Sequence, residues 1–199
     1  MTRERSNSMR RTLAAATEQD HQALHDHPWI SRLANKTLVL EDYGKILGSY
    51  CLFFKGIETS RSAADTFAEL SVDRAVKALE TDLSELGSQP FTPEQQALPN
   101  PVTPPEILAA LYALHGSGFG ARHLNNNVKE VLPNAPRSYL SAGTDPKVWR
   151  LLVQELDVMG ADPVAQLLLI SATSMMFRSF GTFVKSYCEE YSHRTTKSF

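Results

Sequence analysis

Three glycines interrupt a segment that otherwise has a strongly helical pattern. Gly116, Gly118 and Gly120 lie within residues 111–124, and each glycine in a helix interior costs up to about 1 kcal/mol relative to alanine. Because Gly116 and Gly120 are four residues apart, they share one face of the helix. Such a bare face lets either a second helix pack closely or a planar ligand lie flat against the backbone. The spacing alone leaves both explanations open.

A histidine near the end of the first predicted helix is the second feature that could do chemistry. His21 is placed beside Leu13, Thr17 and Leu24, at the edge of the apolar stripe. A histidine at such a boundary is either a hydrogen-bonded structural residue or, as a neutral imidazole that faces a pocket, a ligand for iron. The helical position by itself is compatible with both roles.

Paired Glu-x-x-His motifs offer a different iron chemistry. Di-iron carboxylate sites use such pairs on facing helices, together with further glutamates. The chain contains Glu18-x-x-His21 and Glu190-x-x-His193, of which the second follows the predicted end of the last helix. A di-iron oxidase is therefore one function that the sequence leaves open, and it predicts that these side chains bind iron directly. Two candidates for the bridging carboxylates lie off the predicted apolar faces: Glu58 and Glu130.

The elements that must position these residues are helices, because apolar residues recur at three- and four-residue intervals and no strand alternation is present. Ser71 and Thr144 are predicted N-caps. We expect a single-domain, all-α helical bundle over residues 1–199, with flexible ends at 1–8 and 192–199. The predicted helices cover about 9–25, 40–61, 72–86, 104–126, 145–158 and 163–191, with a turn at 29–34 and loops at 88–105 and 133–143.

Composition places the chain among ordinary globular proteins, since 42% of its 199 residues are hydrophobic and the formal net charge is -2. This net charge gives no electrostatic reason to expect nucleic acid as a partner. An acidic redox partner is not excluded, because a local basic patch would hardly alter the net charge. The polar N-terminus and the short apolar run at 164–170 predict neither a secretory signal nor a membrane span. Cys51 and Cys188 are interpreted as reduced thiols of a cytoplasmic protein.

The order and spacing of these motifs resemble the heme oxygenase family, and in particular the bacterial biliverdin-producing enzymes associated with phytochromes or iron acquisition. A Thr-x-x-x-His segment is matched by Thr17 and His21. The family pattern Tyr-x-Leu-x-Gly-Ser-x-x-Gly-Gly/Ala is matched from Tyr112 to Ala121. The Trp149 segment and the aromatic last helix are also similar, so that the resemblance covers about residues 13–187.

The resemblance implies a heme-oxygenase-like bundle that opens heme to biliverdin and releases iron and carbon monoxide. Heme b would be both substrate and cofactor, dioxygen the oxidant, and a ferredoxin or an NAD(P)H-dependent reductase the source of electrons. A bacteriophytochrome is a candidate acceptor of the biliverdin. Neither nucleic acid nor a membrane is expected as a partner.

The resemblance also implies roles for individual residues. His21 is the expected axial ligand of the heme iron, while Gly116, Ser117 and Gly120 form the distal, catalytic face. Arg10 and Lys185 are additional basic candidates for the heme propionates. The other residues expected to bind heme are Thr17, Tyr112, Ala121, Phe177, Phe180, Arg11 and Arg178.

Three positions depart from the family pattern. His25 replaces a carboxylate that relatives commonly have four residues after the proximal histidine. His115 replaces a glutamate before the Gly-Ser pair, and Ala14 replaces a basic residue seven before the proximal histidine. These changes leave open how the propionates are oriented, and therefore which meso carbon is attacked. They also motivate a second alternative, a non-catalytic heme carrier or sensor with the same fold.

Overall fold

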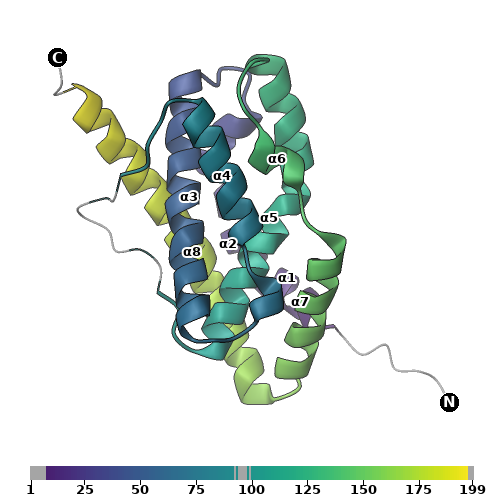
Figure 1. Ribbon diagram of the computed structural model, residues 1–199. Coiled ribbons are helices and arrows are strands. Elements are labelled where there is room, and N and C mark those ends of the chain that lie inside the picture. Colours follow the sequence, from purple (N-terminus) through teal and green to yellow (C-terminus); the bar gives the residue numbers. More distant parts are fainter. Residues whose placement is uncertain (1–7, 92, 94–97, 99, 197–199) are drawn as a thin grey trace.

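Helices make up all the regular structure in the part of the chain that the computed structural model describes, residues 8–196 without 92, 94–97 and 99. This finding confirms the predicted all-α fold class (Figure 1). In chain order the elements are α1 (Met9–Ala16), α2 (Glu18–His25), the 3-10 helix η1 (Ile30–Ala34), α3 (Leu40–Ala63), the 3-10 helix η2 (Ala68–Leu70), α4 (Asp73–Glu85), α5 (Pro104–Val131), α6 (Ser138–Ala142), α7 (Pro146–Met159) and α8 (Pro163–Thr196).

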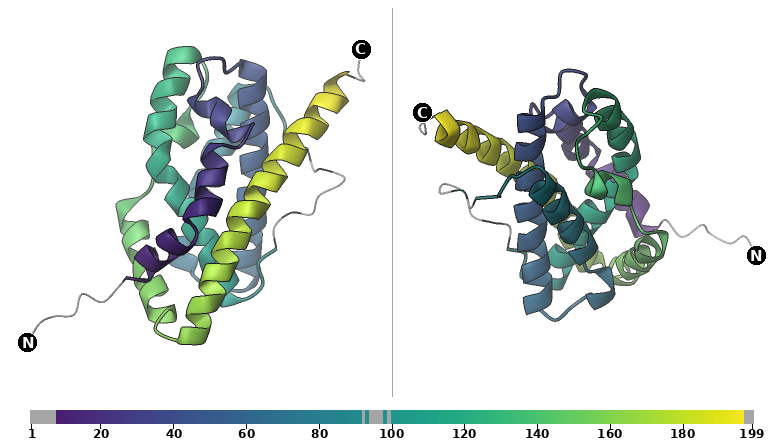
Figure 2. Two further views of the ribbon diagram at one scale, coloured as in Figure 1. Left: turned by 180° about the vertical axis from the view of Figure 1, so that it is seen from behind. Right: turned by 45° about the horizontal axis from the view of Figure 1, so that its top comes forward.

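The long helices α3, α5 and α8 pack on one another and form the body of the bundle. Seen from behind, α1 and α2 cross the face between α5 and α8 (Figure 2). The short helix α6 lies against α4 and α5, and α7 packs on α5 and α1. This arrangement brings the first helix, the glycine-containing helix and the last helix around a common space, although they are far apart in the sequence.

Helix α3 is a central element, because its buried residues occur on all of its faces rather than on one stripe. Gly48 allows α8 to approach closely, since an added Cβ would lie 2.4 Å from the hydroxyl oxygen of Tyr187. Phe53 and Phe183 continue this contact, with ring centroids 5.6 Å apart. The two helices thus form one continuous aromatic layer.

The first predicted helix is divided into two helices at Thr17. The backbone of Thr17 has φ -113° and ψ 14°, and its Oγ1 donates a hydrogen bond of 2.8 Å to the carbonyl oxygen of Leu13. Such a bond from a threonine to the carbonyl four residues earlier weakens and bends a helix. The bend lies one turn before His21 and helps to set the direction of α2.

The predicted N-cap of the helix at 146 is wrong, because Asp145 and not Thr144 caps α7. The Asp145 carboxylate accepts hydrogen bonds from the backbone nitrogens of Lys147 and Val148. The Thr144 hydroxyl instead donates to the backbone oxygen of His115, at 2.8 Å. Thr144 therefore attaches the loop before α7 to the glycine-containing helix. The predicted Ser71 cap is also displaced, since α4 begins at Asp73 after Val72, although Ser71 Oγ still accepts from the Asp73 nitrogen.

The region predicted as a loop at 133–143 contains the short helix α6. Its N-terminus is held by Asp82 of α4, which is fully buried. The Asp82 carboxylate accepts hydrogen bonds from the backbone nitrogens of Ser138 and Tyr139, at 2.7 and 2.9 Å. The acceptor lies more than fifty residues earlier in the chain, so the local sequence carries no sign of this helix.

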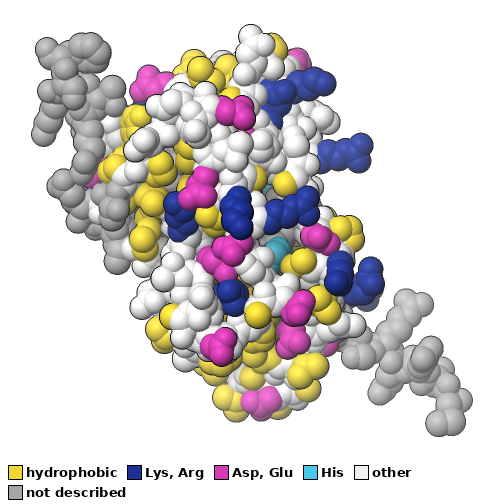
Figure 3. Space-filling model, in the orientation of Figure 1, with side chains coloured by type: hydrophobic (Ala, Val, Ile, Leu, Met, Phe, Trp, Pro, Cys, Tyr) yellow, Lys and Arg dark blue, Asp and Glu magenta, His cyan; other side chains and the backbone are white. Residues whose placement is uncertain are grey.

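Helix α8 is long and apolar enough, by length and composition alone, to span a membrane over Pro163–Ser192, but 44% of its most apolar window is buried inside the fold. Exposed apolar side chains gather where α7 and α8 meet, at Val158, Val164 and Leu167, and charges of both signs cover the face with α3 and α4 (Figure 3).

The expectation of flexible ends falls mostly outside the described residues. Within them, α8 continues to Thr196, beyond its predicted end.

The structure predicts that Asp82→Asn lowers the free energy of unfolding by about 1–3 kcal/mol, because the backbone nitrogens of Ser138 and Tyr139 lose a buried, charged acceptor. Urea unfolding at neutral pH measures this change. Glu85→Gln is the matched control on the exposed side of α4, and we expect it to stay within about 0.5 kcal/mol of the parent protein. Equal effects of the two substitutions would contradict a capping role for Asp82.

Candidate functional site

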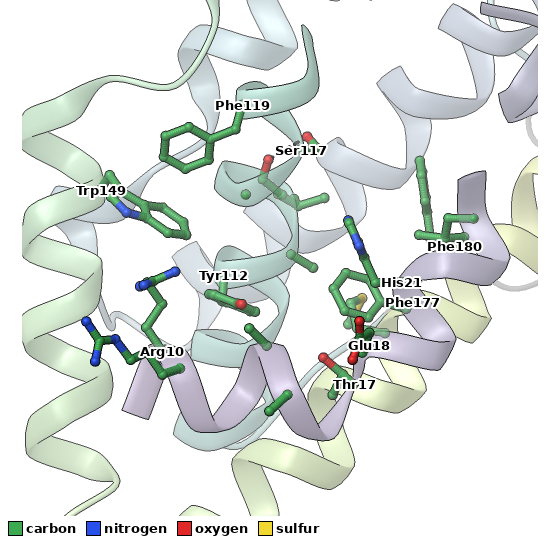
Figure 4. Close-up of a pocket in the computed structure, with 18 of the residues that line it drawn as sticks. Arg10, Thr17, Glu18, His21, Tyr112, Ser117, Phe119, Trp149, Phe177 and Phe180 are labelled. Carbon is green, nitrogen blue, oxygen red and sulfur yellow. Dashed lines mark hydrogen bonds between the residues drawn. The ribbon is translucent and has the colours of Figure 1, made fainter. Parts of the chain in front are cut away.

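A cavity of about 850 Å³ lies between α1, α2, α3, α5, α7 and α8 (Figure 4). Its volume is in the range of sites that hold cofactors or drug-sized ligands. The bent pair α1–α2 forms one wall and the glycine-containing helix α5 forms another. Apolar and aromatic side chains make up most of the lining: Leu24, Phe53, Phe54, Tyr112, Leu114, Phe119, Trp149, Met176, Phe177 and Phe180.

His21 reaches this cavity from α2 (Figure 4). Its ring packs on Phe177, with centroids 5.4 Å apart, and meets His25 edge-on at 4.8 Å and 87°. Desolvation, followed by the charge of His25, lowers the pKa of His21 below its usual value. The imidazole is therefore neutral at physiological pH, so that a ring nitrogen has a lone pair available for a metal.

Helix α2 is attached to α8 by the residue next to His21. The Asp20 carboxylate accepts hydrogen bonds from Ser174 Oγ and from Arg178 Nε, the latter at 2.7 Å. The bond from Arg178, more than that from Ser174, lowers the pKa of Asp20. Arg178, expected at a heme propionate, does not line the cavity and instead holds the helix that carries His21 in place.

The three glycines of α5 have different surroundings. A Cβ on Gly118 would lie 2.3 Å from Thr144 Oγ1 and 2.8 Å from the Thr144 backbone nitrogen, so this glycine is required for close packing. A Cβ on Gly116 would meet only the edge of Trp149 at 4.0 Å, and one on Gly120 would meet nothing within 4 Å. The two explanations left open by the sequence therefore apply to different positions. Gly118 packs against the protein, whereas Gly116 and Gly120 face open space.

Polar groups are concentrated at two parts of the cavity wall. Ser117 Oγ donates to the backbone oxygen of Leu114 at 2.7 Å and lines the cavity on the α5 side. Tyr112 stacks on Trp149, with centroids 5.8 Å apart, and burial raises its pKa. Arg10 and Arg11 line the cavity from α1. The arginines bring positive charge to one end of an otherwise apolar space, which suits a ligand that is flat, apolar and anionic at one edge.

The structure brings most of the predicted residues together, but not all of them. The predicted residues that line the cavity are Thr17, His21, Tyr112, Gly116, Ser117, Phe177, Phe180 and Arg11. Gly120 and Ala121 do not, and Ala121 lines a smaller cavity of about 90 Å³ on the other side of α5. His115 also belongs to that smaller cavity, where its Nε2 lies 2.9 Å from the Leu70 carbonyl oxygen. Lys185 is not among the lining residues either.

Several lining residues could not be found from the sequence motifs. Phe53 and Phe54 have the pattern of ordinary core residues of α3, yet they form part of the cavity wall. Phe119 is exposed and stands edge-on to Trp149, with centroids 4.8 Å apart. Glu18 shares the α2 face with His21. Only the packing of α2, α3 and α7 around α5 and α8 shows that these side chains meet a common space.

Nothing in the described part of the chain supports the di-iron alternative. Among the described side chains of residues 8–192, apart from the gaps given above, no three His, Cys, Asp or Glu residues are close enough to hold a metal ion. The side chain of His193, from the second Glu-x-x-His pair, lies outside the described part of the chain. Glu58 is bound to Arg61 and to the backbone nitrogen of Val72. Glu130 lies on the surface near Lys36.

Comparison with solved structures identifies what this arrangement is similar to. The structure of the Neisseria meningitidis heme oxygenase with bound NO and CO aligns with a TM-score of 0.72 and 22% identity, over 92% of each chain. The chain shares the heme oxygenase fold. The Leptospira interrogans heme oxygenase aligns at 0.68 and 16%, over 89% of this chain and 98% of that one. Heme oxygenase-1 of Synechocystis in complex with heme aligns at 0.66 and 12%, over 96% and 99%.

No family model matches the chain, and no curated sequence matches it either. The relation to heme oxygenases is therefore one of fold, and at this level of identity the residues of the cavity must be judged by their own geometry. A porphyrin requires one axial ligand, two apolar faces and donors for its carboxylates. His21 is suited to be the axial ligand, and the arginines of α1 can donate to the carboxylates. Phe177 and the bare backbone at Gly116 offer the two apolar faces.

The glycine surroundings predict opposite effects of two identical substitutions in α5. Gly118→Ala should lower the free energy of unfolding by about 1–3 kcal/mol, because the new methyl group overlaps Thr144. Gly120→Ala should raise it by up to about 1 kcal/mol, because alanine favours the helix and meets no neighbour. Chemical denaturation of the heme-free protein tests both. Destabilisation by Gly120→Ala as large as that by Gly118→Ala would show that the space next to Gly120 is not open in solution.

Proposed function

We propose that this chain is a heme oxygenase of the bacterial biliverdin-producing type. The observation that carries the proposal is that a neutral His21 on α2 and the side-chain-free backbone of Gly116 on α5 line the same aromatic cavity of about 850 Å³. The heme oxygenase fold supports it. The reaction would use dioxygen and electrons from a ferredoxin or an NAD(P)H-dependent reductase, in the cytoplasm, and a bacteriophytochrome is a candidate acceptor of the product.

The residues of the cavity have separable tasks in this proposal. When bound, heme would supply redox-active iron and the ring that is opened to biliverdin, with release of iron and carbon monoxide. His21 would hold the iron through its unprotonated ring nitrogen. Phe177 and Phe180 exclude water from one face, whereas Gly116 leaves room for a small ligand at the other. Ser117 places a hydroxyl at that second face, and in this structure that hydroxyl donates its proton to the Leu114 carbonyl oxygen.

The end of the cavity near α1 is the proposed site of the heme propionates. Arg10 provides guanidinium donors there and Tyr112 provides a hydroxyl (Figure 4). Arg11 also lines the cavity from α1. Arg178 is not proposed for this task, because it pairs with Asp20 and does not line the main cavity. The orientation of the porphyrin therefore depends on α1, the helix directly before the one that carries the axial ligand, and not on the last helix.

A hemin titration tests the assignment of the axial ligand. His21→Ala should weaken hemin binding by at least about tenfold and shift the Soret band, and added imidazole should restore the spectrum by occupying the vacated position. His123→Ala is the matched control, since His123 is exposed on α5 and does not line the cavity. Unchanged ligation in the His21 variant would overturn the assignment.

A substitution that fills the cavity tests the space at α5. Gly116→Leu should weaken hemin binding by about tenfold or more, because the new side chain would enter the volume that the porphyrin needs, while Gly120→Leu should have a smaller effect because Gly120 does not line the cavity. The Soret absorbance measures both. A Gly116 variant that binds hemin as the parent protein does would place the porphyrin elsewhere.

Turnover separates an enzyme from a carrier. With bound hemin, ferredoxin, its reductase and NADPH, we expect the Soret band to decay and the broad absorption of biliverdin to appear. Catalase in the assay removes free peroxide, so that ring opening by diffusing peroxide is not counted. Hemin that stays intact under these conditions would reject the enzymatic proposal and favour the carrier or sensor.

A further inference from the structure

A tyrosine of α6 reaches the wall between the two cavities. Ser117 lines both the main cavity and the smaller one of about 90 Å³ on the other side of α5, and Tyr139 lines the smaller one. The Tyr139 hydroxyl lies 3.4 Å from Ser117 Oγ. Its ring is fixed between Tyr50 and Phe54, whose centroids are 6.1 and 5.8 Å away at nearly right angles. The hydroxyl therefore has one well-defined neighbour on the side of the main cavity.

The direction of this hydrogen bond follows from the number of protons. A serine hydroxyl has one proton and accepts with its lone pairs. Ser117 donates its proton to the Leu114 carbonyl oxygen at 2.7 Å, so the Tyr139 hydroxyl must be the donor to Ser117. Burial raises the pKa of Tyr139 to about 12, which keeps its proton in place at physiological pH.

The position of Tyr139 depends on the buried carboxylate of α4. Asp82 accepts hydrogen bonds from the backbone nitrogens of both Ser138 and Tyr139. This pair of bonds fixes the first turn of α6, from which the Tyr139 ring extends towards α5. A fully buried carboxylate costs free energy unless its partners compensate, and here the compensation orients one specific side chain.

We propose that Tyr139 is a positioning residue for Ser117, so that the Ser117 hydroxyl can turn its single proton into the main cavity and donate it to a ligand at the face opposite His21. The proposal rests on the proposed function. With Tyr139 donating to the Ser117 oxygen, that oxygen keeps a partner when the Ser117 proton leaves the Leu114 carbonyl. Without Tyr139 the same rotation leaves the Ser117 oxygen without a donor. A chain of two hydroxyls donating in one direction also makes the terminal hydroxyl a stronger donor.

Fluoride binding to the ferric hemin complex tests this inference without turnover. Fluoride is a small anion that binds ferric heme and accepts hydrogen bonds. Because a net hydrogen bond contributes about 0.5–1.5 kcal/mol, equivalent to about a twofold to tenfold change in affinity, Ser117→Ala should weaken fluoride binding by that factor. Tyr139→Phe should weaken it similarly, although the substituted ring lies on the far side of Ser117 from the ligand.

The double variant distinguishes one path from two independent effects. If Tyr139 acts through Ser117, Ser117→Ala combined with Tyr139→Phe should bind fluoride as weakly as Ser117→Ala alone. Tyr50→Phe is the matched control, since Tyr50 is also buried but makes its ring contact with Tyr139 and not with Ser117. We expect its fluoride affinity to stay within about twofold of the parent protein, as an order-of-magnitude limit for a change that removes a tyrosine hydroxyl but no donor to Ser117.

Three results would overturn the inference. They are a normal affinity in Tyr139→Phe, a normal affinity in Ser117→Ala, and additive losses in the double variant. Failure of the parent protein to bind hemin at all is a different outcome, because it rejects the proposed function first and this inference with it. Normal hemin binding by all the variants, read from the Soret band, shows that the heme site is intact in each.

Discussion

The distance between α2 and α5 is the constraint on which the rest of the structure depends. A planar ligand fits between these helices only if neither collapses onto the other, and an apolar cavity of this size favours collapse. Helix α8 prevents it by packing on both helices at once. Asp20 adds a directed contact, because its bonds to Ser174 and Arg178 fix α2 on α8 one residue before His21.

Helix α5 combines two opposite requirements along a few residues. At Gly118 the backbone lies against the loop before α7, and the Thr144 hydroxyl reinforces this contact through the carbonyl oxygen of His115. At Gly116 the same helix leaves space beside the cavity. Close packing on one side therefore keeps the helix rigid while its other side stays bare. A helix weakened by glycines needs such support, since each glycine favours the unfolded chain.

The charged side chains discussed above have one of two tasks: some hold neighbouring helices together, and others line the cavity. Asp82 and Asp20 satisfy backbone or side-chain donors of neighbouring elements, and both act on a residue next to the cavity wall. Arg10 and Arg11 instead line the cavity itself. Their charges are thus available to a ligand, whereas the charge of Arg178 is already paired.

The sequence by itself determined the helical class, most helix positions and the residues that resemble a heme site, because apolar periodicity and proline or glycine signals act over a few neighbouring residues. It also placed His21 and Gly116 in separate helices, and both residues line the cavity. Only the tertiary structure decided that Gly118 packs while Gly116 faces the cavity, that Arg178 pairs with Asp20, and that Asp82 creates α6. The physical reason is that each of these depends on a partner distant in the chain, and local patterns carry no information about such partners.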